Sequence, residues 1–334
     1  MIRTVIIGSG NIAHTRHIPN IRRSGLAVLH GIYNRSLEHS RKDAGELGCK
    51  AYTCLDEIWA DSCVDAVIIC TPASTHCRYT LAALAAGKHV LCEKPMSVTA
   101  GEAALMLEAS DNAEAKLMVS HNQRYYGPHI KARELLDAGV IGIVLNVRSC
   151  LGLDLPMDDA CPEDYNAASE VLSHRIDLMH YLLSSSVSGV TARLTRVDAQ
   201  GRSRYVTSGD DTAMAILQYE NGVIASLTAS RVSYNGNDRT TRIFGTKGSI
   251  TLYGQKAPVC VELADGQTEY FCLPDVPSQR EVEKTLVDEA FFQCILNDGP
   301  PPVSARDGLR AQEAGRQAGA TRQGQLPWVP PKKS

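Results

Sequence analysis

The chain has 334 residues, enough for two domains at roughly 100–200 residues per domain. Hydrophobic residues make up 44% and charged residues 21%, which is typical of a globular protein and argues against disorder. The net charge is -3 and no basic tract is present, so nucleic acid is not an expected partner. No stretch approaches the ~20 apolar residues of a membrane span, and the first residues do not resemble a signal peptide. We therefore expect a soluble, cytoplasmic protein without membrane contact.

The first ~120 residues alternate between strand-like and helix-like segments. Short apolar runs that predict strands are RTVIIG, AVLHGIY, VDAVIICTP, KHVLCEKP and AKLMVSHN. The segments between them predict helices: NIAHTRHIPNIRRSG, SLEHSRKDAGELG, STHCRYTLAALAAG and TAGEAALMLEASDNA. Three of these segments end in glycine, a common helix C-cap. Continuous apolar strands that alternate with helices indicate a doubly wound parallel sheet covered on both faces.

The second part of the chain has a different pattern. Two further helices are predicted at GPHIKARELLDAG and ASEVLSHRIDLMHYLLS, and strands dominate past Val187. Asn221-Gly222 between alternating runs predicts a hairpin turn. We expect an α+β domain with a mostly antiparallel open sheet, and an extended, proline-rich tail. The predicted division is a dinucleotide-binding domain at residues 1–122 and a substrate-binding and oligomerisation domain at residues 123–334.

The eleven cysteines contain no C-x-x-C pair, and several lie within apolar runs. An odd count without metal-ligand spacing predicts reduced thiols that serve as small core residues. His14 and His17 lie one turn apart, but the sequence offers no further ligands beside them. We expect surface or packing roles for both histidines and no metal site.

A glycine-rich loop follows the first predicted strand and precedes the first helix. It has the pattern Gly8-x-Gly10-x-x-Ala, with Asn11 and Ile12 inside it. Glycines there permit a tight turn and a close backbone approach to a pyrophosphate at the start of a helix. The loop predicts dinucleotide binding; the alternative is a simple turn between strand and helix.

The end of the second strand bears on the choice between NAD(H) and NADP(H). An acid that binds the ribose hydroxyls is typical of NAD sites, but this chain has Asn34, Arg35 and Ser36 there. The fork of a guanidinium can pair with a 2′-phosphate, so we lean slightly to NADP(H). An exposed arginine at the start of a helix is the alternative.

Three stretches together resemble the Gfo/Idh/MocA oxidoreductase family, named for glucose–fructose oxidoreductase and inositol dehydrogenase. They are GSGNIAHTRHIPNI, VDAVIICTPASTHCRYTLAALAAGKHVLCEKPM and SHRIDLMHYLLS. The resemblance implies a Rossmann domain followed by an α+β domain, and it implies that Lys94 is catalytic and Glu93 lies near the nicotinamide ribose. It assigns Thr71, Pro72 and His76 to a cofactor-lining segment. It also implies that the peptide bond after Lys94 is often cis. The alternative for this dipeptide is a surface turn with an exposed Glu–Lys pair.

A second catalytic candidate comes from the helix after residue 167. Glu170, His174, Asp177 and Tyr181 recur at i, i+4, i+7 and i+11, which predicts one polar stripe. We expect Asp177 to orient the imidazole of His174 and to raise its pKa from about 6.5, so that His174 can accept a hydroxyl proton. The alternatives are a solvated helix face or a histidine in the core.

The sequence departs from the family pattern in front of His174. Relatives have two glycines and an aspartate before this histidine, whereas this chain has NAASEVLSH. Either Glu170 replaces the aspartate, or a short deletion leaves no equivalent. Asn122, Arg124 and Tyr125 match a family segment at the domain junction. Two roles are open: these residues contact a sugar, or Arg124 pairs with an acid across the interface.

The leading hypothesis is an NAD(P)-dependent dehydrogenase that acts on a secondary hydroxyl of a sugar, inositol or glycoside. A second hypothesis is a cofactor-dependent glycosidase that works by transient oxidation and elimination. A third is a non-catalytic nucleotide-binding sensor, since fold alone does not define function. As in relatives, we expect a homodimer or homotetramer.

Overall fold

The computed structural model describes residues 1–153, 167–197, 202–206, 209–232, 238–272 and 286–320. Its first domain contains a six-stranded, all-parallel sheet with strand order β3-β2-β1-β4-β5-β6. The strands are β1 (Ile2–Ile7), β2 (Ala27–Tyr33), β3 (Lys50–Ala51), β4 (Ala66–Ile69), β5 (His89–Cys92) and β6 (Leu117–Val119). This order is that of a Rossmann fold and confirms the predicted doubly wound sheet.

Helices flank this sheet in the order predicted. A π-helical turn at Ala13–His17 leads into the first helix; the helices are α1 (Ile18–Ser24), α2 (Leu37–Leu47), α3 (Leu55–Ala60), α4 (Ala73–Ala85) and α5 (Ala100–Asn112). Gly25 and Gly48 end α1 and α2 with φ of 65° and 69°, the left-handed conformation of a C-cap. The short elements β3 and α3 were not predicted.

The second domain is built on a nine-stranded sheet with order β15-β14-β13-β12-β7-β11-β10-β8-β9. Its strands are β7 (Val144–Gly152), β8 (Val187–Val197), β9 (Ser203–Tyr205), β10 (Thr212–Tyr219), β11 (Ile224–Ser230), β12 (Thr241–Gly245), β13 (Gly248–Leu252), β14 (Val259–Leu263) and β15 (Thr268–Phe271). The pairing is antiparallel apart from the parallel pair of β7 and β11, so the predicted mostly antiparallel sheet is confirmed. Gly222 has a φ of 85° in the predicted hairpin turn between β10 and β11.

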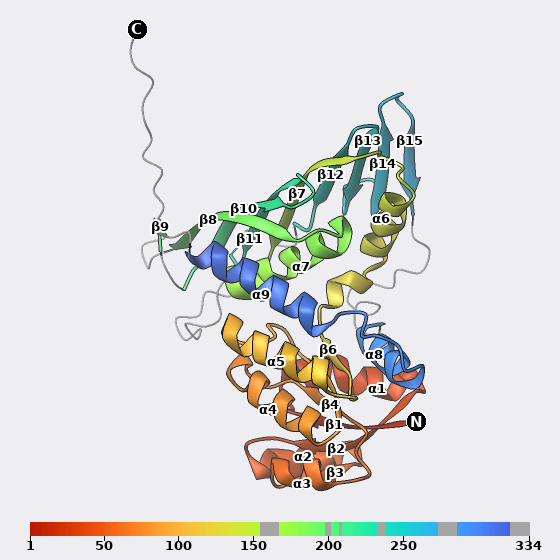
Figure 1. The fold of residues 1–334 in the computed structure, drawn as a ribbon, viewed down its shortest axis with the longest axis vertical. Coiled ribbons are helices and arrows are strands. Elements are labelled where there is room, and N and C mark those ends of the chain that lie inside the picture. The colour runs from red at the N-terminus through yellow and green to blue at the C-terminus, as the bar shows by residue number, and fades with distance from the viewer. Residues whose placement is uncertain (154–166, 198–201, 207–208, 233–237, 273–285, 321–334) are drawn as a thin grey trace.

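Helices cover the face of this sheet that is turned toward the first domain, as Figure 1 shows. They are α6 (Gly127–Asp137), the π-helical turn η3 (Ala167–Val171), α7 (Leu172–Leu183) and α9 (Ala305–Ala320), while the 3-10 turn η2 (Asn122–Tyr125) packs against α6, α7 and α8. Residues of β10 are alternately buried and exposed, and Met214 and Ile216 on its outer side are 56% and 52% exposed. Among the described residues, the outer face of the sheet carries no helix.

Two helices near the carboxyl end of the chain return to the first domain. Helix α8 (Leu286–Leu296) places Val287, Phe291 and Phe292 in the core of the six-stranded sheet. Helix α9 packs against α5 of the first domain and α7 of the second. The predicted boundary after residue 122 stays a prediction, but α8 lies in the first core although the predicted division assigns it to the second domain.

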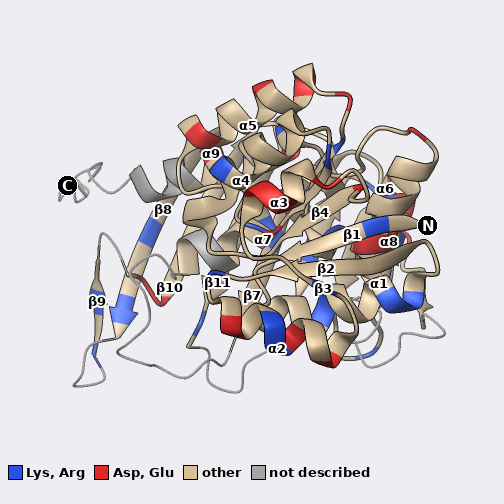
Figure 2. Cartoon of the chain, turned by 90° about the horizontal axis from the view of Figure 1, so that it is seen from below, with Lys and Arg blue, Asp and Glu red and all other residues tan. Residues whose placement is uncertain are grey.

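The charged residues are mixed in sign, and the described cysteines form no disulfide. Figure 2 shows acidic and basic residues interspersed over the helices, with both signs on α2. Ten cysteines are described and are free thiols, whereas Cys161 lies outside the described residues, as does the predicted extended tail. Within the described part of the chain, no helix is long and apolar enough to cross a membrane.

Candidate active site

The glycine loop joins β1 to the π-helical turn, and its two glycines meet different demands. Gly8 has a φ of 94°, and a Cβ there would lie 2.8 Å from Thr71 Cγ2, so the protein's own packing requires glycine. Gly10 has no such constraint, since a Cβ built on it would meet nothing within 4 Å. Open space directly over the second glycine of this motif fits a dinucleotide pyrophosphate, which needs close approach to the backbone.

The residues after β2 support this loop. Asn34 donates its side-chain amide to Ser9 Oγ at 3.0 Å, and its backbone N–H donates to Ser40 Oγ at 2.7 Å. Ser36 caps α2 by accepting from the His39 N–H. Arg35 is exposed and has no hydrogen-bond or ion-pair partner in the described part of the chain, so its guanidinium is available to a ligand.

His76 connects the loops that follow β4 and β5. Its side chain is buried, with one ring nitrogen 2.7 Å from the Thr71 carbonyl oxygen and the other 2.9 Å from the Pro95 carbonyl oxygen. The structure thus assigns His76 a supporting position, and contact of Thr71, Pro72 and His76 with a cofactor stays a prediction. The peptide bond between Lys94 and Pro95 is cis, as the resemblance implied.

Glu93 lies buried at the carboxyl end of β5 and is surrounded by donors. Its Oε1 accepts from Ser120 Oγ at 2.9 Å and lies 3.0 Å from His17 Nε2 and 3.3 Å from an Arg16 nitrogen. Its Oε2 accepts from the backbone N–H of Lys94 at 3.1 Å. Burial raises the pKa of Glu93, but the hydrogen bond to His17 and the charges of Arg16, His17 and Lys94 outweigh it and hold the pKa well below its usual range.

The charge of Lys94, which follows β5, acts on two histidines of the neighbouring segments. His174 lies in the first turn of α7, and its pKa is well below the usual value because of burial and because of the positive charge of Lys94. Burial likewise lowers the pKa of His121, which follows β6 and to which Lys94 also contributes. Neither ring nitrogen of His121, nor Nδ1 of His174, has a hydrogen-bond partner among the described residues. Both imidazoles are therefore neutral near pH 7.

The expected role of Asp177 as the partner of His174 is wrong. Both oxygens of Asp177 accept from Arg124, at 2.9 Å from Nε and 2.6 Å from a terminal nitrogen, and the carboxylate is 1% exposed. A planar guanidinium satisfies a buried carboxylate at two points, which a single imidazole nitrogen cannot do. Asp177 therefore does not raise the pKa of His174, which is lowered.

The sequence left two roles open for Arg124, contact with a sugar or an ion pair with an acid, and the structure shows the ion pair. Besides Asp177 on α7 it contacts Asp307 on α9 at 3.4 Å, so it pairs with acids across the domain junction. Asn122 donates to the Tyr126 hydroxyl at 3.0 Å, and the buried Tyr125 hydroxyl has no partner among the described residues. Substrate contact by Asn122 and Tyr125 stays a prediction. Glu170 lies in η3, but its side chain is outside the described part of the structure.

Three side chains of this site were not identified from the sequence. Arg16 and His17 are in the helix after the glycine loop, and Asp288 on α8 lies 2.6 Å from His17 Nδ1. His17 is completely buried, so it is a packing residue as expected, but it also contacts the Glu93 carboxylate. Burial alone would lower the pKa of His17, yet the Asp288 carboxylate raises it well above the usual value.

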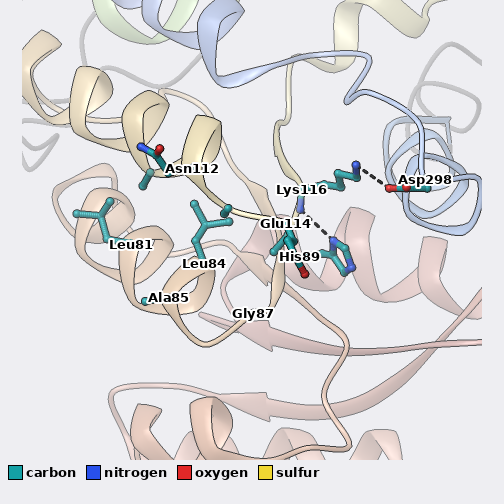
Figure 3. Close-up of a pocket in the computed structure, with 12 residues that line it drawn as sticks. Leu81, Leu84, Ala85, Gly87, His89, Asn112, Glu114, Lys116 and Asp298 are labelled. Atoms are coloured by element: carbon teal, nitrogen blue, oxygen red, sulfur yellow. Dashed lines mark hydrogen bonds and ion pairs between the residues drawn. The ribbon is translucent and has the colours of Figure 1, made fainter.

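A cavity of about 960 Å³ lies elsewhere, at the amino ends of β5 and β6. Figure 3 shows Lys116 reaching Asp298, at 2.8 Å, while its backbone N–H donates to His89 Nδ1 at 3.0 Å. Ligands in doubly wound sheets bind at the carboxyl ends of the strands, and none of the candidate residues above lines this cavity. We therefore do not assign the active site to it.

A Rossmann sheet with a glycine loop, joined to an α+β domain, is the architecture of a dinucleotide-dependent oxidoreductase. Comparison with known families agrees. Residues 2–121 match the model described as the oxidoreductase family, NAD-binding Rossmann fold, and residues 129–251 match the GFO/IDH/MocA C-terminal domain. The chain belongs to the Gfo/Idh/MocA family.

The similarity to individual relatives covers nearly the whole chain. It is 30% identical to myo-inositol 2-dehydrogenase of Thermotoga maritima and 30% identical to inositol 2-dehydrogenase of Rhizobium meliloti, each over 93% of both proteins. Among solved structures, levoglucosan dehydrogenase in complex with NADH and L-sorbose has a TM-score of 0.83 at 24% identity and covers 96% of this chain and 97% of the other. This last likeness concerns the fold.

The space above Gly10 yields a test of the nucleotide site. We expect Gly10→Val to remove NAD(H) binding, because the side chain occupies the position of the pyrophosphate, and to leave the thermal unfolding temperature nearly unchanged. Cofactor affinity can be measured by quenching of protein fluorescence. Gly8→Val is the comparison, since the positive φ and the contact with Thr71 should destabilise the fold itself. Unchanged affinity in Gly10→Val would contradict the assignment.

Proposed function

We propose that this chain is an NAD(P)-dependent dehydrogenase that acts on a secondary hydroxyl of an inositol or a related sugar. The main support is the meeting of Lys94 from the first domain with a neutral His174 from the second, at the carboxyl edge of the sheet that carries the glycine loop. The names of the inositol dehydrogenases to which the chain is similar support the substrate class.

Lys94 and His174 would have different roles in the transfer of the hydroxyl proton. The Lys94 ammonium donates to the substrate oxygen and stabilises the negative charge that develops on it. His174 is neutral and partly exposed, so it is ready to accept the hydroxyl proton without first losing one of its own. When bound, the nicotinamide supplies the carbon that accepts the hydride.

The cofactor site would use the residues that face the loop. Gly8, Gly10, Asn11 and Ile12 would hold the pyrophosphate, and Arg35 would lie near the adenosine ribose. Open space over Gly10 and the unpaired state of Arg35 support this placement.

A substrate screen tests the proposal. Inositols, sugars and glycosides are incubated with NAD⁺ and with NADP⁺, and the nicotinamide absorbance is recorded together with product formation. We expect reduced cofactor to accumulate in proportion to product for at least one polyol. Product without net reduction would favour the glycosidase alternative, and cofactor binding without turnover of any compound would favour a sensor.

The lean to NADP(H) rests on Arg35 and can be measured directly. We expect Arg35→Ala to weaken NADP(H) binding more than NAD(H) binding, because only the former loses a charge-assisted hydrogen bond of about 1.5–3 kcal/mol. Dissociation constants for both cofactors by titration calorimetry provide the measurement. Equal losses would show that Arg35 does not bind the 2′-phosphate.

Turnover tests the roles of Lys94 and His174. We expect Lys94→Met to reduce kcat by about 10²–10³-fold, the scale for loss of one preorganised donor, with cofactor affinity little changed. His174→Ala should reduce kcat by about 10²–10⁴-fold. The double variant should lose less than the product of the two losses, since both residues act on one proton transfer.

The lowered pKa of His174 predicts the direction in which activity changes with pH. A base with a depressed pKa stays unprotonated to lower pH, so wild-type activity should fall only below about pH 6.5, the usual pKa of histidine. This acid limb should be absent in His174→Ala. Wild-type turnover in Lys94→Met at saturating substrate would refute its catalytic role.

We also propose that the outer face of the nine-stranded sheet mediates a homodimer or homotetramer, because it exposes Met214, Ile216 and Ile224 side by side on β10 and β11. Multi-angle light scattering should give a mass above that of one 36.2 kDa chain. Met214→Glu combined with Ile216→Glu should lower that mass; a monomeric wild type would contradict the proposal.

A further inference from the structure

His17 occupies an unusual position between two acids. It is completely buried, with Nε2 3.0 Å from Glu93 Oε1 on one side and Nδ1 2.6 Å from Asp288 Oδ1 on the other. Asp288 is also completely buried and accepts from the Asn20 side-chain amide at 2.6 Å. A chain of contacts thus runs from α8 through the π-helical turn before α1 to the end of β5.

The geometry requires a particular protonation state. An ionised carboxylate can only accept hydrogen bonds, and a neutral imidazole has a single N–H. With both carboxylates ionised, two oxygens at hydrogen-bond distance from the two ring nitrogens require N–H on both, which is the imidazolium. The other groups around it are Cys70 after β4, Arg16 in the same helical turn and Lys94 after β5. Cys70 also hydrogen-bonds His17 and raises its pKa, whereas the cationic side chains of Arg16 and Lys94 cannot accept a proton. Asp288 is the acid that meets Nδ1, at 2.6 Å.

The imidazolium affects the turn at Lys94 and Pro95, which follows β5, through its contact with Glu93. One oxygen of Glu93 lies against His17, Ser120 and Arg16, while the other accepts from the backbone N–H of Lys94. Loss of the His17 donor would leave the carboxylate less constrained, and the Lys94 backbone would shift with it. A displacement of 1 Å in such a group can cost about 10²-fold in rate.

We propose that His17 is a positioning residue, an imidazolium clamped between Asp288 and Glu93 that fixes the Lys94 backbone for catalysis. The proposal rests on the function proposed above, because it assumes that Lys94 acts on the substrate. Asp288 supplies the counter-charge that keeps His17 protonated.

Magnetic resonance tests the clamp without substrate. In protein labelled with ¹⁵N-histidine and ¹⁵N-lysine, the His17 and Lys94 signals are assigned by their loss in His17→Gln and Lys94→Met. We expect both ring nitrogens of wild-type His17 to stay protonated from pH 6 to pH 8.5. A neutral His17 at pH 7.5 would overturn the proposal, whether or not a substrate is known.

The variant Asp288→Asn keeps the size of the side chain but removes its charge. The pKa of His17 should then fall, so that His17 loses its second proton as the pH rises between 6 and 9. The Lys94 amide signal should move with that titration, and kcat should drop about 10- to 100-fold at pH 8.5 but much less at pH 6. The NADH dissociation constant should change less than about 3-fold, since the glycine loop is untouched.

Glu289→Gln is the matched control, because it removes the same charge from the next residue of α8, and no partner of Glu289 is described. Its pH profile should equal that of the wild type. A pH-independent loss of kcat in Asp288→Asn, or a Lys94 amide signal that does not follow His17, would reduce the contact to ordinary packing and refute the proposal. If wild-type protein oxidises no polyol while the Lys94 signal follows His17, the proposed function fails and the clamp stands.

Discussion

A carboxylate inside a protein stays ionised only if donors surround it, and Glu93 is the group on which the edge of the sheet is organised. Its donors come from the helix after the glycine loop, from the residue after β6 and from its own turn. The segments that would bind pyrophosphate, nicotinamide and substrate are therefore tied to one buried charge. Because burial disfavours the charge of Glu93, the carboxylate must keep these hydrogen bonds to stay ionised. The hydrogen bonds in turn fix the shape of the backbone at Lys94.

The junction between the domains depends on a second buried charge. Arg124 binds Asp177 of α7 at two points and Asp307 of α9 at one, and it lies at the end of the chain segment that leaves β6. Removing either partner of such a pair leaves the other charge buried without a counter-charge, which lowers the stability of the fold by about 3–5 kcal/mol. Because α7 also carries His174, this pair fixes the helix on which the second-domain histidine lies. Asp177 is thus essential to the geometry without contacting the imidazole.

The sequence predicted what is local and missed what depends on distant partners. The five main strands, the glycine loop and the hairpin at Gly222 follow from short-range apolar patterns and glycine conformation. The two-residue strand β3 is too short for any pattern. Helix α8 was missed although Thr285-x-x-Asp288 at its start has the spacing of a capping box. His174 lies three residues before Asp177 on the same helix, so the local pattern favours this pair, whereas Arg124 reaches the carboxylate only through tertiary packing. His17 and Asp288 are 271 residues apart, so no local signal could connect them.

The position of α8 in the chain has a consequence for biosynthesis. Val287, Phe291 and Phe292 complete the core of a domain whose strands end at residue 119, and Asp288 completes its buried ion chain. At about 5–20 residues per second, a ribosome needs on the order of ten seconds to make the intervening chain. During that time the emerging sheet lacks one wall of its core, and His17 lacks its counter-charge. The core of the nucleotide-binding domain is therefore completed only after α8 has been made, about 170 residues after its last strand.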